Sequence, residues 1–390
     1  MDVLFKIKTL NNIADCGLKK FDATKYIISD NEESPEGIIL RSFDMHTMEI
    51  MQGLLAIARA GAGVNNIPID KCSEKGIVVF NTPGANANAV KELAIASLLL
   101  SSRKIIDGIN WVNTLAGSED VPKLVEKGKS KFIGPELEGK TLGVFGLGAI
   151  GVMVANSALA LGMEVIGYDP YISVDAAWGL SRNVKRALDA KSVLESADYI
   201  TLHVPLNNET RGMINDDTLG SCKDGIRIIN LSRGDLVNDD AIEKALESGK
   251  AACYVTDFPN DKTLKMKNVI AIPHLGASTP ESEDNCAVMA CRQLIEYLEG
   301  GNIINSVNFP ETYMPKSASC RLCIAHKNIP NMLSQFSGLL ALRNINIEDL
   351  LNKSKKELAY TLIDTNASVS DEDVDKLKGI EGVLSVRVIR

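Results

Sequence analysis

Gly146-Leu-Gly-Ala-Ile-Gly151 lies between two segments of different character. Residues 140–145 before it are a short apolar run that predicts a buried strand, and residues 149–161 after it predict a helix. In a strand–turn–helix unit, the first glycine permits a tight turn, the second lets the backbone approach a phosphate, and the third lets helix and strand pack closely. The helix N-terminus adds free N–H groups, so the stretch predicts the pyrophosphate site of a dinucleotide.

The next apolar run, residues 164–168, ends in Asp169. A carboxylate at that strand end can accept hydrogen bonds from both hydroxyls of an adenosine ribose and repels a 2′-phosphate. The sequence therefore favours NAD over NADP as cofactor.

Short apolar runs continue to alternate with amphipathic ones after this point. Residues 199–204, 227–231, 252–256 and 268–272 have the character of strands, and residues 239–248, followed by Gly249, have that of a helix. This alternation predicts a doubly wound parallel sheet. Residues 1 to about 98 repeat the alternation more weakly, with strands at 37–40, 54–58 and 76–80, and predict a second unit of the same class.

The C-terminal part differs from both units. Pro310 and Pro315 bracket a linker, and the following segments read β-α-β-β-α-β, at 320–325, 332–342, 345–351, 358–364, 371–377 and 383–389. The predicted fold class is therefore α/β, with two Rossmann-like doubly wound domains and a C-terminal ferredoxin-like α+β domain.

Composition narrows the class of protein. With 42 basic and 50 acidic residues the chain has no basic field for nucleic acid. Residues 1–8 lack a signal-peptide layout, and the glycines, Asn156 and Ser157 within the apolar stretch 145–163 argue against a membrane span. Eight scattered cysteines fit a reducing, cytoplasmic setting. Cys320-x-x-Cys323 has no second pair and no His at zinc-finger spacing, so no metal is expected.

Three polar residues follow predicted strands and are candidates for catalysis. His274 comes after the strand at 268–272, Arg233 after that at 227–231, and Asp257 after that at 252–256. Sites of open α/β sheets lie beyond the carboxyl ends of strands. A base, a bidentate carboxylate binder and an acid beside a nicotinamide indicate hydride transfer at a hydroxyl-bearing carbon next to a carboxylate.

The motifs together resemble a known family. Gly146–Gly151, Asn230-Leu-Ser-Arg-Gly-Asp-Leu-Val237 and Pro273-His-Leu-Gly-Ala-Ser-Thr279 are similar to motifs of the D-isomer-specific 2-hydroxyacid dehydrogenases. Ala58-Arg-Ala-Gly-Ala-Gly-Val-Asn65 and Asn81-Thr-Pro-Gly-Ala-Asn86 look like that family's substrate-domain loops. The resemblance covers nearly the whole chain.

The resemblance implies a role for each candidate residue. His274 would accept the proton of the C2 hydroxyl, Arg233 would bind the substrate carboxylate or carbonyl, and Asp257 would hold the nicotinamide carboxamide. Other implied cofactor-binding residues are Gly146, Gly148, Ala149, Ile150, Gly151, Asp169, Pro205, Ser232, Gly276 and Ala277. Implied substrate-binding residues are Arg41, Ser42, Lys131 and the backbone of Ala62 and Gly63.

The resemblance also implies a discontinuous organisation. Residues 1–98 and 282–309 would form the substrate-binding domain, 99–281 the NAD-binding domain, and 316–390 a regulatory module similar to an ACT domain. In that module His326 and Asn328 would bind L-serine between paired subunits of a homodimer or homotetramer. The alternative is that the module only dimerises and binds no amino acid. Asn331 stands where the family usually has Gly, and this departure favours the alternative.

One position departs from the family pattern. The family places a Glu between the nicotinamide Asp and the His, but residues 258–273 contain no Glu. Asp261 could replace it, a more distant acid could reach in, or His274 could work without a carboxylate partner. Asp261 could equally be a turn residue after Pro259 and Asn260.

Leu40-Arg-Ser42, Lys131-Phe-Ile-Gly134 and the C-terminal module resemble features of the family members that act on a phosphorylated substrate. The expected reaction is NAD-dependent oxidation of 3-phospho-D-glycerate to 3-phosphohydroxypyruvate, the first step of L-serine biosynthesis. The alternatives are a dehydrogenase for another D-2-hydroxy acid and a catalytically weakened protein that senses NAD.

Overall fold

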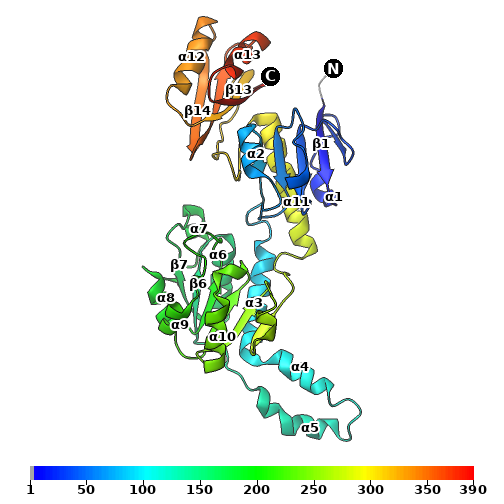
Figure 1. Ribbon diagram of the computed structural model, residues 1–390, viewed down its shortest axis with the longest axis vertical. Coiled ribbons are helices and arrows are strands. Elements are labelled where there is room, and N and C mark those ends of the chain that lie inside the picture. The colour runs from blue at the N-terminus through cyan, green and yellow to red at the C-terminus, as the bar shows by residue number, and fades with distance from the viewer. Residues whose placement is uncertain (1–3) are drawn as a thin grey trace. The chain divides into compact units, whose positions relative to one another are not determined.

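A computed structural model describes residues 4–390 of the chain. Contacts between residues divide the chain into two compact units. The first unit comprises the described part of residues 1–86 together with 283–390, and the second comprises residues 87–282. The elements of both are labelled in Figure 1.

The second unit is built on seven parallel strands in the order β12-β11-β10-β9-β6-β7-β8. The strands are β6 (Thr141–Phe145), β7 (Glu164–Tyr168), β8 (Lys185–Arg186), β9 (Tyr199–Leu202), β10 (Ile226–Asn230), β11 (Ala251–Thr256) and β12 (Val269–Ala271). The strand order reverses between β6 and β9, which is where doubly wound sheets bind ligands. The predicted parallel sheet is thereby confirmed.

The helices and short turns of the second unit either precede its first strand or connect its strands. They are α3 (Ala87–Arg103), α4 (Ile105–Asn113), α5 (Val121–Gly128), η2 (Lys129–Phe132), α6 (Ala149–Ala160), α7 (Val174–Gly179), α8 (Ala190–Ser196), α9 (Asp216–Ser221), η3 (Gly234–Leu236), α10 (Asp239–Ser248) and η4 (Thr263–Lys265). The capping residues explain where α10 starts and ends. The Asn238 side chain accepts a hydrogen bond from the Ala241 N–H, and Gly249 takes a left-handed φ of 80° at the C-terminus.

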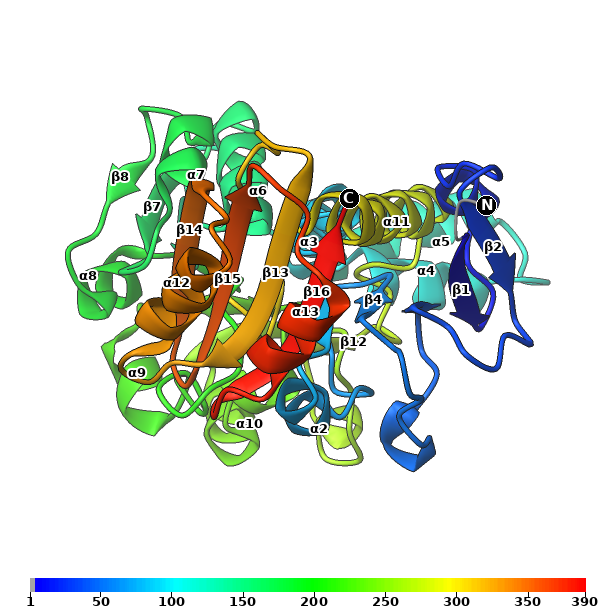
Figure 2. The ribbon, with the colours of Figure 1, turned by 90° about the horizontal axis from the view of Figure 1, so that it is seen from above.

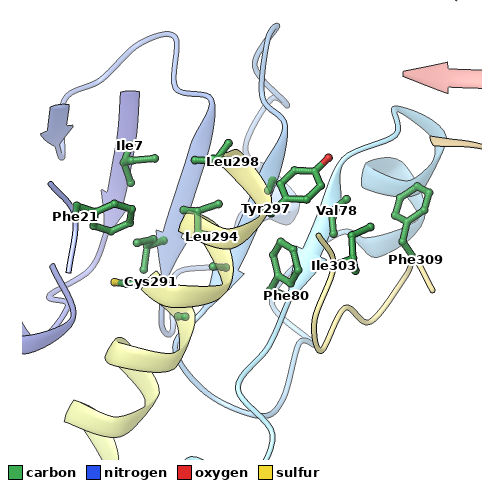
Figure 3. Packing of buried hydrophobic residues seen from close by; sticks show 14 of the residues in the cluster. Ile7, Phe21, Val78, Phe80, Cys291, Leu294, Tyr297, Leu298, Ile303 and Phe309 are labelled. Carbon is green, nitrogen blue, oxygen red and sulfur yellow. The ribbon is translucent and has the colours of Figure 1, made fainter. Parts of the chain in front are cut away.

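The first unit contains a five-stranded parallel sheet in the order β2-β1-β3-β4-β5. Its elements are β1 (Phe5–Leu10), α1 (Asp15–Leu18), β2 (Tyr26–Ser29), β3 (Gly37–Leu40), η1 (Met45–Thr47), β4 (Ala56–Arg59), α2 (Ile69–Glu74) and β5 (Val78–Phe80), joined by α11 (Pro280–Gly300). Figure 3 shows α11 packing Cys291, Leu294 and Leu298 into the core that holds Ile7 and Phe21.

Two strands of this sheet were not expected from the sequence. In β1, Lys6 and Lys8 flank Ile7, which is fully buried, and the Lys8 ammonium donates to the Glu32 carbonyl at 2.7 Å. The charged side chains therefore point away from the core at alternate positions of the strand. They interrupt the apolar run in the sequence, so no strand was predicted there. β2 has only four residues, Tyr26–Ser29, which are too few to show a clear pattern in the sequence.

The C-terminal module has the expected β-α-β-β-α-β order. Its elements are β13 (Cys320–Lys327), α12 (Met332–Leu342), β14 (Ile347–Lys355), β15 (Leu358–Thr365), α13 (Asp371–Lys378) and β16 (Val383–Ile389). The antiparallel sheet has the order β14-β15-β13-β16. Figure 2 shows α12 and α13 on one face of it, where Phe336 and Leu377 are buried.

The other face of the module's sheet packs into the core of the first unit. Ala325, Tyr360 and Leu362 are buried there with Phe309 and Tyr297. Cys320 belongs to the helix-covered face and Cys323 to the opposite one, so the two thiols of the Cys-x-x-Cys point to opposite sides of the sheet.

Two arginines tie the module to the end of α11. Arg321 is fully buried, pairs with both carboxylate oxygens of Asp364 at 2.6 and 2.9 Å, and donates to the carbonyls of Gly300 and Met314. The Arg387 guanidinium lies over the Tyr297 ring at 4.6 Å and donates to the Leu298 carbonyl at 2.8 Å. These contacts explain why the module does not separate as a third unit.

The boundary between the units differs from the expected one at about residue 98. α3 packs Val90, Ala94 and Leu98 into the core of the second unit, and the division therefore falls before Ala87. Among residues 4–390, no helix combines the length and apolar composition needed to cross a membrane.

Candidate functional site

The glycine turn after β6 has the geometry that its spacing predicts. Gly146 adopts a φ of 87°, and a Cβ there would overlap the His203 carbonyl. A Cβ on Gly151 would overlap the Gly146 carbonyl oxygen, whereas one on Gly148 would meet open space. Gly148 precedes α6, whose first residues are Ala149 and Ile150. The open space at a helix N-terminus fits a pyrophosphate.

Asp169 at the end of β7 is tied to this turn. One carboxylate oxygen accepts the Leu147 N–H and the other accepts the Tyr171 N–H, both at 2.8 Å. A carboxylate has about four lone-pair sites, so Asp169 can still accept ribose hydroxyls. The structure thus fixes the orientation of the carboxylate next to the phosphate turn.

Arg233 is presented by a turn that Asn230 organises. Asn230 is fully buried; its amide nitrogen donates to the Arg233 carbonyl at 2.8 Å and its amide oxygen accepts the Ser232 N–H at 3.2 Å. The Ser232 hydroxyl donates to the Leu202 carbonyl at 2.7 Å, linking the turn to β9. The Arg233 side chain is exposed. Asn230 stood in the sequence motif, but its role was not predicted because it depends on these tertiary bonds.

Asp257 follows β11 and is 1% exposed. One of its oxygens accepts the Gly276 N–H at 3.1 Å, and the other is buried with no hydrogen-bond partner among the described residues. Burial raises the pKa of Asp257, while the Gly276 N–H and the charges of His274 and Arg233 oppose that rise. An unpartnered buried acceptor at the same edge of the sheet as the dinucleotide turn fits the amide of a nicotinamide carboxamide.

His274 has an unusual backbone. Its φ is 31°, and its N–H donates to the Asp257 carbonyl at 3.0 Å. Non-glycine residues at positive φ are uncommon and cluster at functional sites. The imidazole is exposed and lies 4.6 Å from the Phe258 ring, measured between centroids. Phe258 was not singled out by sequence reasoning.

The structure does not bring Asp261 to His274. Asp261 is exposed in the turn that Asn260 forms by accepting the N–H groups of Lys262 and Thr263. Within residues 4–390, no side chain makes a hydrogen bond or an ion pair with the His274 imidazole. Of the three possibilities left by the missing Glu, the structure corresponds to a His274 without a carboxylate partner.

The other expected cofactor residues lie at the same edge of the sheet. Pro205 follows β9 and accepts the Thr210 hydroxyl through its carbonyl, while Gly276 and Ala277 follow β12. His203, which sequence reasoning assigned to a strand, lies just after β9. Burial lowers its pKa to about 4, its Nε2 bonds Thr201 at 2.9 Å, and its Nδ1 is buried without a partner in the described chain.

The expected substrate residues of the first unit lie after β3 and β4. Arg41 forms an ion pair with Glu283 at 2.7 Å, and the Ser42 N–H donates to the Asn11 side chain. No hydrogen bond from the N–H groups of Ala62 and Gly63 is found to any of residues 4–390. Such unused backbone donors fit an anion.

Arg59 stands at the end of β4, beside this loop, and was missed as a candidate. Its Nε donates to the Arg41 carbonyl at 3.1 Å. A Cβ on Gly61, whose φ is 153°, would overlap the Arg59 guanidinium, so the glycine is required for the close approach of this cation. Its place inside the Ala58–Asn65 motif was the available signal. Lys131, in the second unit, is exposed on η2.

The side chains of the two expected regulatory residues make hydrogen bonds within the C-terminal module. His326 is 2% exposed; its Nδ1 bonds the Lys327 carbonyl and its Nε2 the Thr361 hydroxyl, each at 2.8 Å. The Asn328 amide donates to the Lys356 carbonyl at 3.0 Å. Asn331, which stands where the family usually has Gly, adopts a left-handed conformation with φ of 70°.

Comparison with known proteins identifies relatives of the chain. Residues 95–276 match the family described as D-isomer specific 2-hydroxyacid dehydrogenase, NAD binding domain. The D-3-phosphoglycerate dehydrogenase of Homo sapiens is 36% identical over 284 residues, which are 70% of this chain and 50% of that protein. The chain thus spans about half the length of such curated relatives.

Solved structures show the same fold. The NAD⁺-bound 3-phosphoglycerate dehydrogenase of Entamoeba histolytica is similar with a TM-score of 0.61 and 26% identity, over 78% of this chain and 99% of that one. The D-lactate dehydrogenase of Aquifex aeolicus, in complex with NAD and lactic acid, gives a TM-score of 0.60 and 26% identity, over 78% of this chain and 100% of that one. By these similarities and by its phosphate turn, the chain belongs to the D-isomer specific 2-hydroxyacid dehydrogenase family and carries that family's NAD-binding domain.

Proposed function

We propose that the protein is an NAD-dependent dehydrogenase of D-2-hydroxy acids. The observation that carries this proposal is the grouping of Asp257, His274 and Arg233 beyond the strands of the NAD-binding unit, where the charges of the latter two act on Asp257. An unpartnered carboxylate oxygen, an exposed imidazole and an exposed guanidinium are the groups that the chemistry requires. Bound NAD supplies the acceptor for the hydride that leaves C2 of the substrate.

Each residue then has one task. The His274 imidazole takes the proton of the C2 hydroxyl as the carbonyl forms. The Arg233 guanidinium binds the substrate carboxylate through two parallel N–H groups, a geometry that a lysine cannot offer. The buried Asp257 oxygen accepts the carboxamide N–H and so orients the nicotinamide ring.

Within this class, the proposed reaction is oxidation of 3-phospho-D-glycerate to 3-phosphohydroxypyruvate, at the head of L-serine synthesis. The names of the curated relatives support this substrate. So do Arg41, directly after β3, and Arg59, at the end of β4, because the loop with the unused N–H groups follows β4 and the Arg59 Nε bonds the Arg41 carbonyl. A phosphate and a carboxylate are the anions that such a loop would receive.

Two observations favour other candidates. Arg41 is already paired with Glu283, and a relative of known structure is a D-lactate dehydrogenase, which supports a non-phosphorylated 2-hydroxy acid. The imidazole without a carboxylate partner supports a catalytically weakened protein that senses NAD. The presence of both His274 and Arg233 argues against a pure sensor, because binding NAD needs neither.

The test is oxidation of NADH, followed by absorbance, with four oxo acids: phosphohydroxypyruvate, glyoxylate, pyruvate and 2-oxoglutarate. The proposal predicts that kcat/KM is highest for phosphohydroxypyruvate. A preference for one of the other three would establish the second candidate. No turnover with any of them, together with retained NADH binding, would establish the sensor.

Arg41 provides a separate test of the phosphorylated substrate. Arg41→Ala should raise the KM for phosphohydroxypyruvate by about tenfold or more and leave that for glyoxylate nearly unchanged, because only the former would lose a charge-assisted contact. Glu283→Gln, which removes the competing carboxylate, is the matched control and should lower the KM for phosphohydroxypyruvate. Equal effects on both substrates would contradict a phosphate role for Arg41.

The C-terminal module is proposed to be an ACT-like regulatory domain that binds L-serine in a homodimer or homotetramer. The left-handed Asn331 before α12 supports a ligand turn of that kind. The internal bonds of His326 support the alternative, a module that serves assembly alone. Calorimetry with L-serine on the full chain and on Asn328→Ala distinguishes the two: heat that the variant loses indicates the regulatory site, and no heat indicates assembly.

A further inference from the structure

A cleft of about 510 Å³ lies in the first unit, on a face of α11 that the core does not use. The helix packs Cys291, Leu294 and Leu298 against the sheet, as Figure 3 shows. Val288, Met289, Arg292 and Glu296 recur at helical spacing and line the cleft instead. The segments around Ala85 and Ile304 form the other wall. The volume is in the range of sites for small molecules, about 300–1,000 Å³.

Gln293 is a buried polar side chain in the wall of this cleft. It is 5% exposed, and both its amide nitrogen and its amide oxygen are buried without a hydrogen-bond partner among residues 4–390. Leaving a buried amide unpaired lowers the stability of the folded state, because each group has lost its hydrogen bonds to water. A leucine at this position would avoid that cost, so the amide is expected to serve a partner from outside the chain.

Two opposite charges flank the same cleft. Within the described chain, the Arg292 guanidinium makes no ion pair or hydrogen bond. Glu296 is held by the Asn302 amide, which donates to its Oε1 at 2.7 Å, while its Oε2 has no such bond. Residues four apart on a helix can pair, but the order Arg before Glu is the less favourable one. The two charges therefore remain available on one wall.

The third component is apolar. Val288, Met289 and Ile304 are half-buried side chains of the same cleft. A ligand that matches all groups carries a carboxylate for Arg292, an ammonium for Glu296, a polar contact for the Gln293 amide and an aliphatic group for these side chains. We propose that this cleft is a binding site for a free α-amino acid with an aliphatic side chain; it is lined by none of the residues assigned above to the dehydrogenase reaction or to the C-terminal module.

The test is isothermal titration calorimetry of the full chain with L-leucine, L-isoleucine, L-valine and L-methionine. At least one of them should bind saturably. For that amino acid, the analogue without the ammonium group and the analogue without the carboxylate should each bind at least about tenfold more weakly, because each loses one charge-assisted contact. For L-leucine these are 4-methylpentanoate and 3-methylbutylamine. Absence of saturable heat with all four amino acids would overturn the proposal.

Variants assign the contacts. Arg292→Gln should weaken amino acid binding about tenfold or more without changing that of the amine analogue, and Glu296→Gln should weaken both while keeping the bond to Asn302. Glu281→Gln, an equal charge change on an exposed residue of the same helix, is the control and should have no effect. Unchanged affinity in Arg292→Gln and Glu296→Gln would show that the amino acid binds elsewhere.

Gln293→Leu separates a binding role from a structural one. Replacing an unpaired amide by an apolar group of similar size should raise the melting temperature of the ligand-free protein while abolishing or weakening binding. A lower melting temperature together with unchanged affinity would mean that the amide supports the fold only, and would contradict its place in the site.

Discussion

At the proposed active site, the hydrogen bonds that single residues make or lack indicate their roles. Asp257 has one satisfied and one unsatisfied oxygen in a buried position, and His274 is held at positive φ by the bond from its N–H to the Asp257 carbonyl. A strained backbone and an unpaired buried acceptor both cost stability. The two features occur at neighbouring strand ends, after β11 and β12, in residues joined by a backbone hydrogen bond, and they support the proposed cofactor site there.

His274→Ala should lower kcat by about 10²- to 10⁴-fold, the usual contribution of general acid–base catalysis. NADH affinity should stay nearly the same, because the imidazole packs on Phe258 and bonds no described residue. Steady-state rates and fluorescence titration with NADH give the two quantities. A wild-type rate in this variant would remove His274 from the mechanism.

His203 predicts how acid affects stability. Its pKa is lowered to about 4 by burial, while an imidazole in the unfolded chain titrates near about 6.5. As the pH falls through about 6.5 the unfolded chain binds the proton first, so the folded state loses stability until the pH reaches about 4. At pH 5 the loss attributable to His203 is about 2 kcal/mol.

His203→Gln removes this titration and retains a group that can bond Thr201. Denaturation by urea at pH 7.5 and pH 5 should therefore show a smaller loss of unfolding free energy in the variant than in the wild type. Parallel losses in the two proteins would mean that the imidazole is accessible to protons in the folded state.

The sequence could supply His274, Arg233, Asp257 and Asp169 because each follows an apolar strand, and the carboxyl ends of parallel strands are where ligands bind. It could not supply Asn230, Phe258 or Arg59. Their roles rest on a hydrogen bond, a ring contact and a close backbone approach that exist only after the turns have formed.

At the scale of elements, two glycines in the turn between β6 and α6 have different surroundings. One of them is needed for the packing of the turn, and the other leaves space for the cofactor. Gly151 has the Gly146 carbonyl where its Cβ would be, and Gly148 has open space. The strength of the repeat from β6 to β12 made this unit predictable. β1 was not predicted, because its two lysines leave the core at alternate positions and interrupt the apolar run.

Gly151→Ala should lower the melting temperature of the cofactor-free protein. Alanine favours a helix by about 1 kcal/mol over glycine, but overlap with a fixed backbone carbonyl costs about 1–3 kcal/mol or more. Gly148→Ala should leave the melting temperature nearly unchanged and weaken NADH binding about tenfold or more, since the methyl group takes the space of the pyrophosphate. Similar melting losses in both variants, or unaltered affinity in Gly148→Ala, would contradict this assignment.

At the scale of the whole molecule, the chain divides into two units, each with its own parallel sheet, and α11 runs from one into the other. The expected boundary at about residue 98 falls within α3, whereas contacts between residues divide the chain before Ala87. One side of α3 is apolar and packs into the core of the second unit. The pattern of residues shows that this side is buried, but it does not show against which of the two units.

The C-terminal module is joined to the first unit through a shared core and through Arg321 and Arg387. Truncation after Phe309 would expose Phe309 and Tyr297, which are now buried. Single substitutions in the full chain therefore test regulation more cleanly than removal of the module.

The proposed activity is transfer of a hydride from C2 of a D-2-hydroxy acid to NAD. The most direct measurement uses 3-phospho-D-glycerate carrying deuterium at C2, with NAD and a trap for the oxo acid product, followed by mass spectrometry of the NADH formed. With the wild type we expect NADH that contains one deuterium, and with His274→Ala strongly reduced formation of that NADH. NADH without deuterium, or no NADH from this substrate or any other D-2-hydroxy acid labelled in the same way, would contradict it.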